Sequence, residues 1–297
     1  MNLAYLCSKN VLPNDPTRRQ DAWEADHQWE VLRSACADRE LVLHPVAWDD
    51  PAWDAKDFDA VVVGPTWDYI REPDAFLARL DGAAKAAPVF NDAELIRWNA
   101  DKRYLDELEA EGVPTVPTHW EDVVDQAALD RAFEAFETEE LVVKPVVGAG
   151  AEGQYKVRRG DPVPVMRGAS MVQPYLRSIE QTGELSVIVV DREVSHVLRK
   201  LPKRGDYRVQ SMFGGREEVL SLTDEVDAFV KRVLGKVRGG LLLARVDLVR
   251  GEDGGLRLIE LELIEPYLYP VQGPRVGEHI AAALDRALRG VGLRKVG

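Results

Sequence analysis

Short apolar runs alternate with stretches of helical spacing through the first third of the chain. Residues 2–7, 41–47 and 59–64 form the apolar runs, and the last of these is typical of a strand that is covered on both faces. Residues 22–36 place apolar side chains on one face of a helix, and residues 73–80 begin a helix with a proline in its first turn. This alternation predicts a small doubly wound α/β unit.

The middle of the chain combines amphipathic stretches with short apolar runs. A long helical stretch ends at Gly112, directly before a proline-containing segment. A buried-strand pattern ends on Lys144, and a glycine-rich turn follows it at 148–153. We therefore expect helices at 93–111 and 126–136, and strands near 115–118, 141–145, 155–157 and 171–173.

The last part of the chain is rich in strand patterns. Asp191 and Arg192 separate two apolar runs and indicate a hairpin. A glycine-rich turn at 251–255 separates two longer runs and indicates a second hairpin. We expect strands at 184–190, 193–200, 208–212, 241–250 and 256–263, and helices at about 224–237 and 276–288.

These elements predict an α/β (α+β) fold with three domains, which a chain of 297 residues can accommodate. We expect an N-terminal doubly wound α/β domain at 1–92 and a small central domain at 93–172. A β-rich C-terminal domain is expected at 173–297.

Composition and charge narrow the classes of function. The chain has 38 Lys and Arg against 51 Asp and Glu, a formal net charge of −13, and this acid excess argues against a nucleic-acid-binding surface. Its two cysteines cannot form a disulfide framework, and its five histidines lack zinc-ligand spacing. We find no signal peptide and no apolar stretch near the about 20 residues of a membrane span. The sequence therefore predicts a cytoplasmic protein that binds neither nucleic acid nor membrane.

A lysine at the end of a buried strand is an unusual place for a solvated charge. Lys144 is followed by a turn that contains Gly148, Gly150 and Gly153. Backbone N–H groups of such a turn can hold phosphate oxygens, because glycine lets them approach closely. The turn lacks the Gly-Lys-Ser/Thr of a Walker loop, and an ordinary hairpin turn with a snorkelling lysine is the alternative.

Three carboxylates are predicted on one face of the second hairpin. Asp247 lies on one strand and Glu260 and Glu262 on the next, and residues two apart on a strand share a face. Such carboxylates repel one another unless cations lie among them, and hard oxygen ligands suit Mg²⁺. Arg245 adds a positive charge to the same face. The alternative, edge strands with polar faces in water, is disfavoured by the apolar residues around them.

A basic cluster follows the strand at 193–200. It contains Lys200, Lys203, Arg204 and Arg208. In an acidic protein, a local group of cations indicates an anionic ligand. A solvated loop is the alternative.

Taken in order, these residues resemble the ATP-grasp superfamily, in particular its glutathione-synthetase-like and D-alanine–D-alanine-ligase-like members and, within these, the cycloserine-synthetase-like branch. The resemblance covers the order of elements over roughly residues 60–270. Each matching run is short, but five runs in the same order are specific. The runs are Asn91-Asp92 through Asn99-Ala100-Asp101-Lys102, Val142-Val143-Lys144-Pro145, Gln173-Pro174-Tyr175-Leu176, Gly205-Asp206-Tyr207-Arg208-Val209, and Arg245-Val246-Asp247 with Glu260-Leu261-Glu262.

The resemblance implies an ATP site. Lys102 and Lys144 resemble the two lysines that hold the ATP phosphates and the edge of the adenine pocket. The turn at 148–153 resembles the glycine loop that closes over the γ-phosphate, and residues 173–176 resemble the hinge whose backbone bonds adenine. The implied nucleotide-binding residues are Lys102, Lys144, Gly148, Gly150, Gly153, Gln173, Tyr175, Leu176 and the ribose-binding Glu180.

The resemblance also implies catalytic and metal-binding residues. Arg208 resembles an arginine at the transferring phosphate, and Arg245 resembles the arginine that D-alanine–D-alanine ligases direct at the developing oxyanion. Asp247, Glu260 and Glu262 look like the ligands of two Mg²⁺ ions. The commoner family pattern ends in Glu-x-Asn, and Glu262 replaces that asparagine, so the geometry of the second metal ion is open.

The candidate substrate residues follow strands of the first and last predicted domains. Loops beyond the carboxyl ends of α/β strands commonly hold ligands, and Trp67, Asp68 and Tyr69 follow such a strand. Cycloserine-synthetase-like proteins carry a similar Trp-Asp-Tyr run. Tyr267 follows the strand of the metal ligands. The alternative for the first run is a helix-capping turn with Trp67 packed in the core.

These observations together predict an ADP-forming ligase that uses ATP and Mg²⁺. Phosphoryl transfer needs cations and donors around the γ-phosphate and its acceptor. We expect a small amino-acid-like carboxylate to be activated as an acyl phosphate and joined to an amine nitrogen, in amino-acid or natural-product biosynthesis. An ATP-driven intramolecular ring closure and a non-catalytic nucleotide-binding module are the alternatives. The resemblance implies a homodimer as one possible oligomeric state. The sequence alone does not determine the oligomeric state, the substrate or the nitrogen donor.

Overall fold

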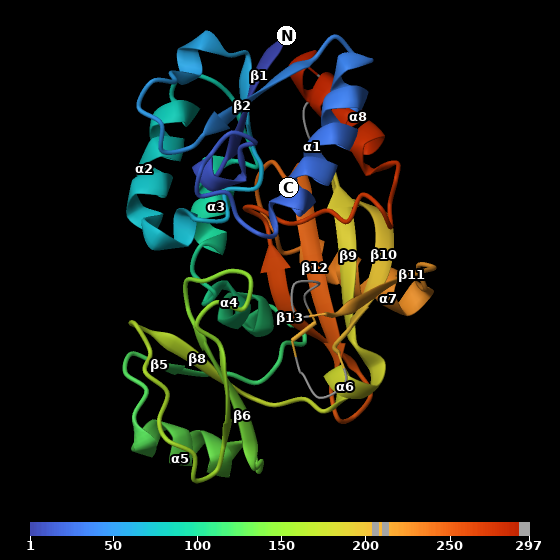
Figure 1. Ribbon diagram of the computed structural model, residues 1–297. Helices are drawn as coiled ribbons and strands as arrows, with labels where there is room; N and C mark the ends of the chain where they lie inside the picture. The colour runs from blue at the N-terminus through green and yellow to red at the C-terminus, as the bar shows by residue number, and fades with distance from the viewer. Residues whose placement is uncertain (204–207, 210–213, 291–297) are drawn as a thin grey trace.

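Three β-sheets form the framework of the described molecule (Figure 1). The computed structural model describes residues 1–203, 208–209 and 214–290. The N-terminal sheet and a central-segment sheet lie at opposite ends, and the C-terminal sheet lies between them. Within the described residues, no helix combines the length and the apolar character that crossing a membrane requires.

The N-terminal sheet has the strand order β2-β1-β3-β4, and its pairs are parallel. Its inner strands are almost entirely buried, because α1 (Ala22–Ala37) and α8 (Val276–Leu288) pack on one face and α2 (Pro73–Ala84) packs on the other. The remaining elements are β1 (Asn2–Cys7), β2 (Val42–Ala47), β3 (Ala60–Val63), β4 (Val89–Phe90) and the 3₁₀ helices η1 (Lys9–Val11), η2 (Ala55–Asp57) and η3 (Tyr69–Arg71).

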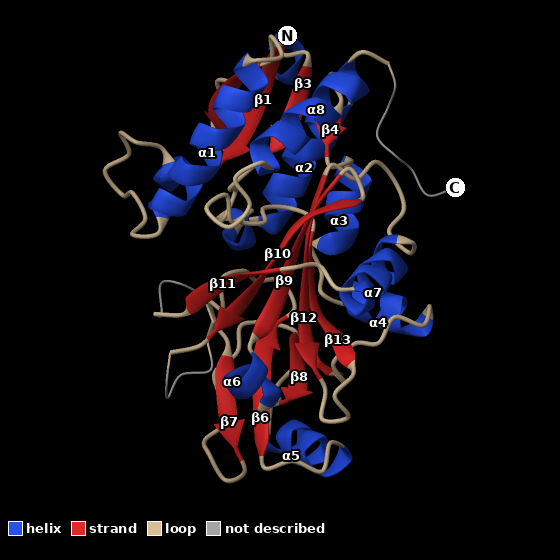
Figure 2. Ribbon diagram, turned by 90° about the vertical axis from the view of Figure 1, so that its right-hand side faces the viewer, coloured by secondary structure: helices blue, strands red, loops and turns tan. Residues whose placement is uncertain are grey.

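The central-segment sheet has the order β5-β8-β6-β7, and its pairs are antiparallel. One helix, α5 (Gln126–Ala135), packs Leu129 and Phe133 against it (Figure 2). This helix begins where the side chain of Asp125 accepts a hydrogen bond from the backbone of Ala128. The strands are β5 (His119–Glu121), β6 (Glu140–Pro145), β7 (Tyr155–Arg158) and β8 (Ser170–Pro174).

The C-terminal sheet has the order β11-β10-β9-β12-β13, and its pairs are antiparallel. The apolar face of α7 (Asp224–Leu234) packs Val230 and Val233 into the same core as the apolar residues of β9, β12 and β13. The other elements are α6 (Ser178–Thr182), β9 (Glu184–Val190), β10 (Glu193–Leu201), β11 (Arg216–Leu220), β12 (Leu243–Arg250) and β13 (Leu256–Glu262).

β13 is the last strand of its sheet, and side chains from two helices bond its outer backbone groups. Asn99 ends α3 (Ala93–Asn99); its Nδ2 donates to the Leu261 oxygen at 2.7 Å, and its Oδ1 accepts from the Leu263 nitrogen at 2.9 Å. Tyr104 begins α4 (Tyr104–Ala110), and its hydroxyl accepts from the Leu261 nitrogen at 2.8 Å. These bonds satisfy buried groups that would otherwise lack partners. They fix the strand that carries two of the three predicted metal ligands.

The structure confirms the mixed α/β class and both hairpins, and it corrects three elements. The helix expected at 93–111 is divided into α3 and α4. No strand forms at 115–118, where Thr115 makes a single bridge to Leu258. Residues 208–209 are not in a strand, whereas 210–212 lie outside the described residues. The domain division stays a prediction, and β8 extends across its boundary at 172.

Candidate active site

A cleft of about 410 Å³ is lined by residues from all three sheets and their loops. A neighbouring recess of about 30 Å³ adds Lys102 and Gly148 to the residues around it. Four predicted site residues, Asp68, Tyr69, Gly153 and Glu180, line neither space. The predicted residues that line the cleft are Trp67, Lys144, Gly150, Gln173, Tyr175, Leu176, Arg208, Arg245, Asp247, Glu260, Glu262 and Tyr267.

Three carboxylates meet on one face of the β12–β13 hairpin. In the strand register, Asp247 lies opposite Glu260, and Arg245 lies opposite Glu262. One oxygen of each of the three carboxylates lies within 4.8 Å of the others. This donor set fits Mg²⁺, which prefers hard oxygen ligands.

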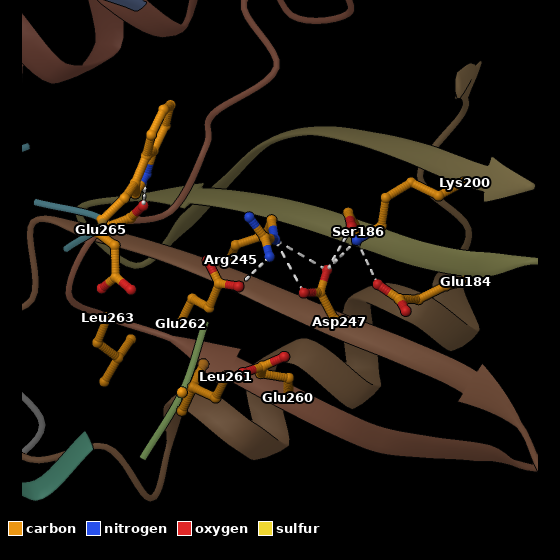
Figure 3. A network of polar contacts seen from close by, with 12 residues as sticks. Glu184, Ser186, Lys200, Arg245, Asp247, Glu260, Leu261, Glu262, Leu263 and Glu265 are labelled. Atoms are coloured by element: carbon orange, nitrogen blue, oxygen red, sulfur yellow. Dashed lines mark hydrogen bonds and ion pairs between the residues drawn. The ribbon is translucent and has the colours of Figure 1, made fainter. Parts of the chain in front are cut away.

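Arg245 neutralises part of this negative charge (Figure 3). Its Nε donates to both oxygens of Asp247, at 3.1 and 2.9 Å, and its Nη2 donates to Glu262. Burial alone would lower the pKa of Arg245, but Asp247 and Glu262 outweigh burial and raise it well above its ordinary value. The guanidinium therefore stays charged between two of the three carboxylates.

The three carboxyl groups differ in pKa because their cationic neighbours differ. Burial acts to raise the pKa of each. At Asp247, Arg245, Lys200 and the hydrogen bond from Ser186 together outweigh burial, and the pKa of that group falls below its ordinary value. Lys102 and Lys144 together have the same effect on the pKa of Glu260. At Glu262, burial and the two neighbouring carboxylates prevail and raise the pKa to about 7.

A buried lysine extends the network. Lys200, on β10, forms an ion pair with Glu184, and its Nζ lies 3.4 Å from Oδ1 of Asp247. Ser186 donates to the same Asp247 oxygen (Figure 3). The sequence placed Lys200 in a basic cluster, whereas Arg204 of that cluster lies outside the described residues, as do residues 205–207 of the matching run. The polar side chains at alternate positions of β9 are the signal that could have identified Glu184 and Ser186.

The two lysines expected to hold phosphates have different surroundings. Nζ of Lys102 lies 3.0 Å from Oε1 of Glu260 and donates to the Gly148 oxygen at 2.5 Å. Burial would lower the pKa of Lys102, but Glu260 and other carboxylates outweigh it and raise the pKa. The ammonium of Lys144 forms no hydrogen bond or ion pair with the part of the chain that the structure describes, and burial lowers its pKa. Within the described residues, Lys144 is therefore a cation in the cleft without a bonded anion.

The glycine-rich turn has a backbone that favours glycine. Gly150 and Gly153 have φ values of 61° and 71°, and Ala151 has the same left-handed conformation at 61°. A β-carbon on Gly148 would lie 2.8 Å from the Pro145 side chain. Since Gly150 and Ala151 line the cleft, the turn presents its backbone to any ligand there.

Residues 173–176 connect β8 to α6 along the wall of the cleft. The side-chain nitrogen of Gln173 donates to Thr118 at 2.9 Å. The hydroxyl of Tyr175 donates to Glu180 at 2.5 Å. Glu180, the predicted ribose-binding residue, is thus hydrogen-bonded to this segment but does not line the cleft.

Of the Trp-Asp-Tyr run, only Trp67 reaches the cleft. Its indole donates to the backbone oxygen of Glu265 at 3.2 Å. Asp68 accepts hydrogen bonds from a serine hydroxyl at 2.6 Å and from the indole of Trp48 at 2.7 Å, and Tyr69 is buried in the core beside the N-terminal sheet. The structure therefore gives Asp68 and Tyr69 structural contacts, and we do not propose either as a substrate residue.

Further polar residues surround Trp67 that the sequence did not reveal. Arg19 donates twice to Asp21, at 2.7 Å each, and its guanidinium lies 5.2 Å from the centre of the Trp67 ring. Glu265, which is 7% exposed, lines the cleft just after β13. Single charged residues in loops follow no regular spacing in the sequence. Their proximity therefore becomes visible only in the folded structure. We call this part of the cleft, lined by Arg19, Asp21, Trp67, Glu265 and Tyr267, the Trp67 end.

Comparison with known proteins gives matches along the chain. Residues 4–91 match the N-terminal domain model of D-cycloserine synthetase DcsG, and residues 122–267 match the ATP-grasp domain of prokaryotic glutathione synthetase. The cycloserine biosynthesis protein DcsG of Streptomyces lavendulae is 30% identical over 265 residues, which cover 82% of this chain and 88% of that protein. The chain belongs to the ATP-grasp family. It is therefore an ATP-dependent ligase of the class that forms C–N bonds, in a family that uses ATP and Mg²⁺.

Solved structures agree with the ATP-grasp assignment. The crystal structure of D-cycloserine synthetase DcsG has a TM-score of 0.81 at 26% identity and covers 97% of this chain and 100% of that chain. The ATP-grasp ligase PsnB with minimal precursor, Mg and ADP has a TM-score of 0.65 at 18% identity, covering 96% of this chain and 97% of that one. D-alanine–D-alanine ligase from Bacillus anthracis with ATP has a TM-score of 0.65 at 16% identity, covering 98% and 100%. The last two show the fold alone.

Proposed function

We propose that this ATP-grasp ligase activates a small amino-acid-like carboxylate with ATP and joins it to a nitrogen. The observation that carries the proposal is the distribution of charge in one cleft. Lys144, a cation without a bonded anion in the described chain, lies beside a glycine turn, and three carboxylates suited to Mg²⁺ line the same cleft. Phosphoryl transfer requires these groups around the transferring phosphate.

Asp247, Glu260 and Glu262 would hold two Mg²⁺ ions. When bound, the ions supply positive charge to the phosphate oxygens. Arg245 and Lys102 contact these carboxylates in the present structure, so their charges already offset part of the repulsion among them. Glu262 gives this site one more carboxylate than the commoner family pattern.

The nucleotide would lie between the glycine turn and the segment at 173–176. Lys102, Lys144 and Arg208 would bind its phosphates, and the backbone of the turn at 148–153 would close over the γ-phosphate. The backbone at 173–176 would bond adenine. Glu180 would bind the ribose after giving up its bond from Tyr175.

The chemistry would proceed in two steps. An oxygen of the substrate carboxylate attacks the γ-phosphorus, the bond to the bridging oxygen breaks, and ADP leaves. The nitrogen then attacks the acyl carbon and loses a proton, and phosphate leaves with the electron pair of the C–O bond. Arg245 is the cation that we assign to the oxyanion that develops in this second step.

An intramolecular ring closure is the second candidate. Its support is the 30% identity to the cycloserine biosynthesis protein DcsG over most of both chains. In that case the attacking nitrogen belongs to the activated molecule itself. The residues of the nucleotide and metal sites would have the same roles in both reactions. A homodimer stays a prediction.

A coupled assay of ADP release tests the proposal. Amino acids and their ureido and hydroxylamine derivatives are supplied singly and in pairs with Mg·ATP. ADP release in the presence of a single compound supports ring closure. ADP release that requires two different compounds supports ligation. Binding of Mg·ATP without turnover on any carboxylate contradicts the proposal.

A further inference from the structure

Glu265 is a buried acidic residue of the cleft wall whose side chain has no bonded partner among the described residues. Glu265 is 7% exposed and lies at the Trp67 end. Its carboxylate makes no hydrogen bond or ion pair with any residue in the described ranges. Figure 3 shows its side chain beyond Glu262, on the side away from Asp247, and the hydrogen bond drawn to this residue ends on its backbone oxygen rather than on its carboxylate.

An unpaired buried carboxyl group is costly, because it has lost its hydration without gaining a counter-charge. Burial, reinforced by the nearby Glu262, raises the pKa of Glu265 well above its ordinary value. Three neighbouring acids have cationic partners. The pairs are Asp247 with Arg245, Glu184 with Lys200, and Glu260 with Lys102.

The cations that act on Glu265 or line the Trp67 end already have anionic partners. Lys102, whose charge acts on Glu265, forms an ion pair with Glu260. Arg19 directs two hydrogen bonds to Asp21, and Arg245 bonds two of the metal-site carboxylates. The aromatic rings of Trp67 and Tyr267 form part of the wall, and aromatic faces attract cations. The end therefore suits a cationic or N–H-donating group.

We propose that Glu265 binds the amino group of the substrate, and that the enzyme thereby selects carboxylates that carry a basic nitrogen over their des-amino analogues. This inference rests on the proposed function, whose substrate class it narrows. Figure 3 shows Asp247, Glu262 and Glu265 one after another along the cleft, so that Glu265 lies next to Glu262. A substrate whose amino group binds Glu265 can therefore direct its carboxylate toward the metal-site carboxylates and the phosphates.

Binding to the Mg·ADP-loaded protein tests this without turnover. Serine, alanine and their ureido and aminooxy derivatives are titrated by calorimetry, each beside its des-amino counterpart. We expect at least one amino acid to bind about tenfold or more tightly than its counterpart, as a charged hydrogen bond provides. Glu265→Gln keeps the shape of the side chain and should abolish that preference, with the affinity for Mg·ADP unchanged.

Glu217→Gln is the matched control. Glu217, on β11, is half-buried, accepts a hydrogen bond from Gln272 at 2.7 Å and lies outside the cleft lining. This variant should keep the preference. The proposal is overturned if no amino acid binds the wild type more tightly than its counterpart, or if Glu265→Gln keeps the preference.

Thermal unfolding provides an independent readout. Glu265→Gln removes no contact, so its midpoint should equal or exceed that of the wild type. A clear drop would mean that the carboxylate has a structural partner and would also overturn the proposal. Failure of the proposed function has a different signature, since it leaves these binding results intact and abolishes ADP release on every carboxylate.

Discussion

The indole of Trp67 donates a hydrogen bond to the backbone oxygen of Glu265 at 3.2 Å, although 198 positions separate them in the chain. The bond joins the loop after β3 to the segment after β13. One wall of the cleft therefore forms only when the N-terminal and C-terminal sheets come together.

Trp67→Phe should weaken substrate binding and leave ATP binding unchanged. Phenylalanine keeps an aromatic ring in the wall but cannot donate to Glu265, and a hydrogen bond contributes about 1 kcal/mol. We expect the KM for the substrate to rise about fivefold in the ADP-release assay. Trp48→Phe is the control, because it also loses an indole bond, to Asp68, away from the cleft; an equal KM change in both variants would contradict the role of Trp67.

Lys144→Met should weaken ATP binding and stabilise the nucleotide-free protein. Its ammonium has no bonded anion in the described chain and its pKa is lowered by burial, so the folded protein gains when the charge is removed. We expect ATP affinity to fall about 10- to 100-fold, the contribution of a charged hydrogen bond. Calorimetry and thermal unfolding measure the two effects. Lys231→Met, at an exposed pair on α7, should change neither; unchanged ATP affinity in Lys144→Met would exclude its role.

Glu260→Gln should abolish turnover while the protein remains folded. The change removes one charged ligand of the proposed metal site and the anionic partner of Lys102. ADP release should disappear, and Mg²⁺ should no longer raise the thermal midpoint. Chelation of Mg²⁺ in the wild type should have the same effect and be reversed by added Mg²⁺. Near-normal activity of this variant would refute the metal site.

Asn99→Leu should destabilise the protein by about 2–4 kcal/mol, because two buried backbone groups, one in β13 and one directly after it, would lose their partners. Tyr104→Phe removes one such bond and should cost about half as much. Urea unfolding measures both. An equal cost for the two variants would argue against the pairing described for β13.

His196 should make stability depend on pH in the acid range. Burial lowers its pKa from 6.5 to about 4 in the folded protein. Between these values the unfolded chain binds a proton that the folded chain rejects. Its contribution to stability is therefore complete above about pH 6.5 and is lost as the pH falls toward 4. His196→Asn should flatten the unfolding free energy across this window, and an unchanged slope would refute the assignment.

The hairpin that carries the three carboxylates could be predicted because its signals are local. Alternation along β12 and β13 places Asp247, Glu260 and Glu262 on one face, and the glycine-rich turn sets the pairing. Lys144 was detectable for a similar reason, as a charge at the end of an apolar run. Lys102 could not be detected from the sequence pattern, because only the family resemblance distinguished it from other lysines in predicted helices.

The Trp67 end could be predicted only in part. Trp67 and Tyr267 were expected as substrate residues, but Arg19, Asp21 and Glu265 join them only in the folded chain. Asp68 was expected to face the substrate, yet its partner Trp48 lies on another loop, and no spacing rule connects the two. Glu265 has no motif of its own. Its importance comes from the absence of a bonded cation among the described residues, which is a property of its surroundings.

The side-chain bonds along β13 also affect how the molecule meets its neighbours. Sheet edges with free N–H and C=O groups recruit strands from other molecules and promote aggregation. Asn99 and Tyr104 occupy those groups in the stretch around Leu261. This stretch of β13, which carries Glu260 and Glu262, is thereby protected from strand addition, and a second copy of the chain could not pair with it backbone to backbone.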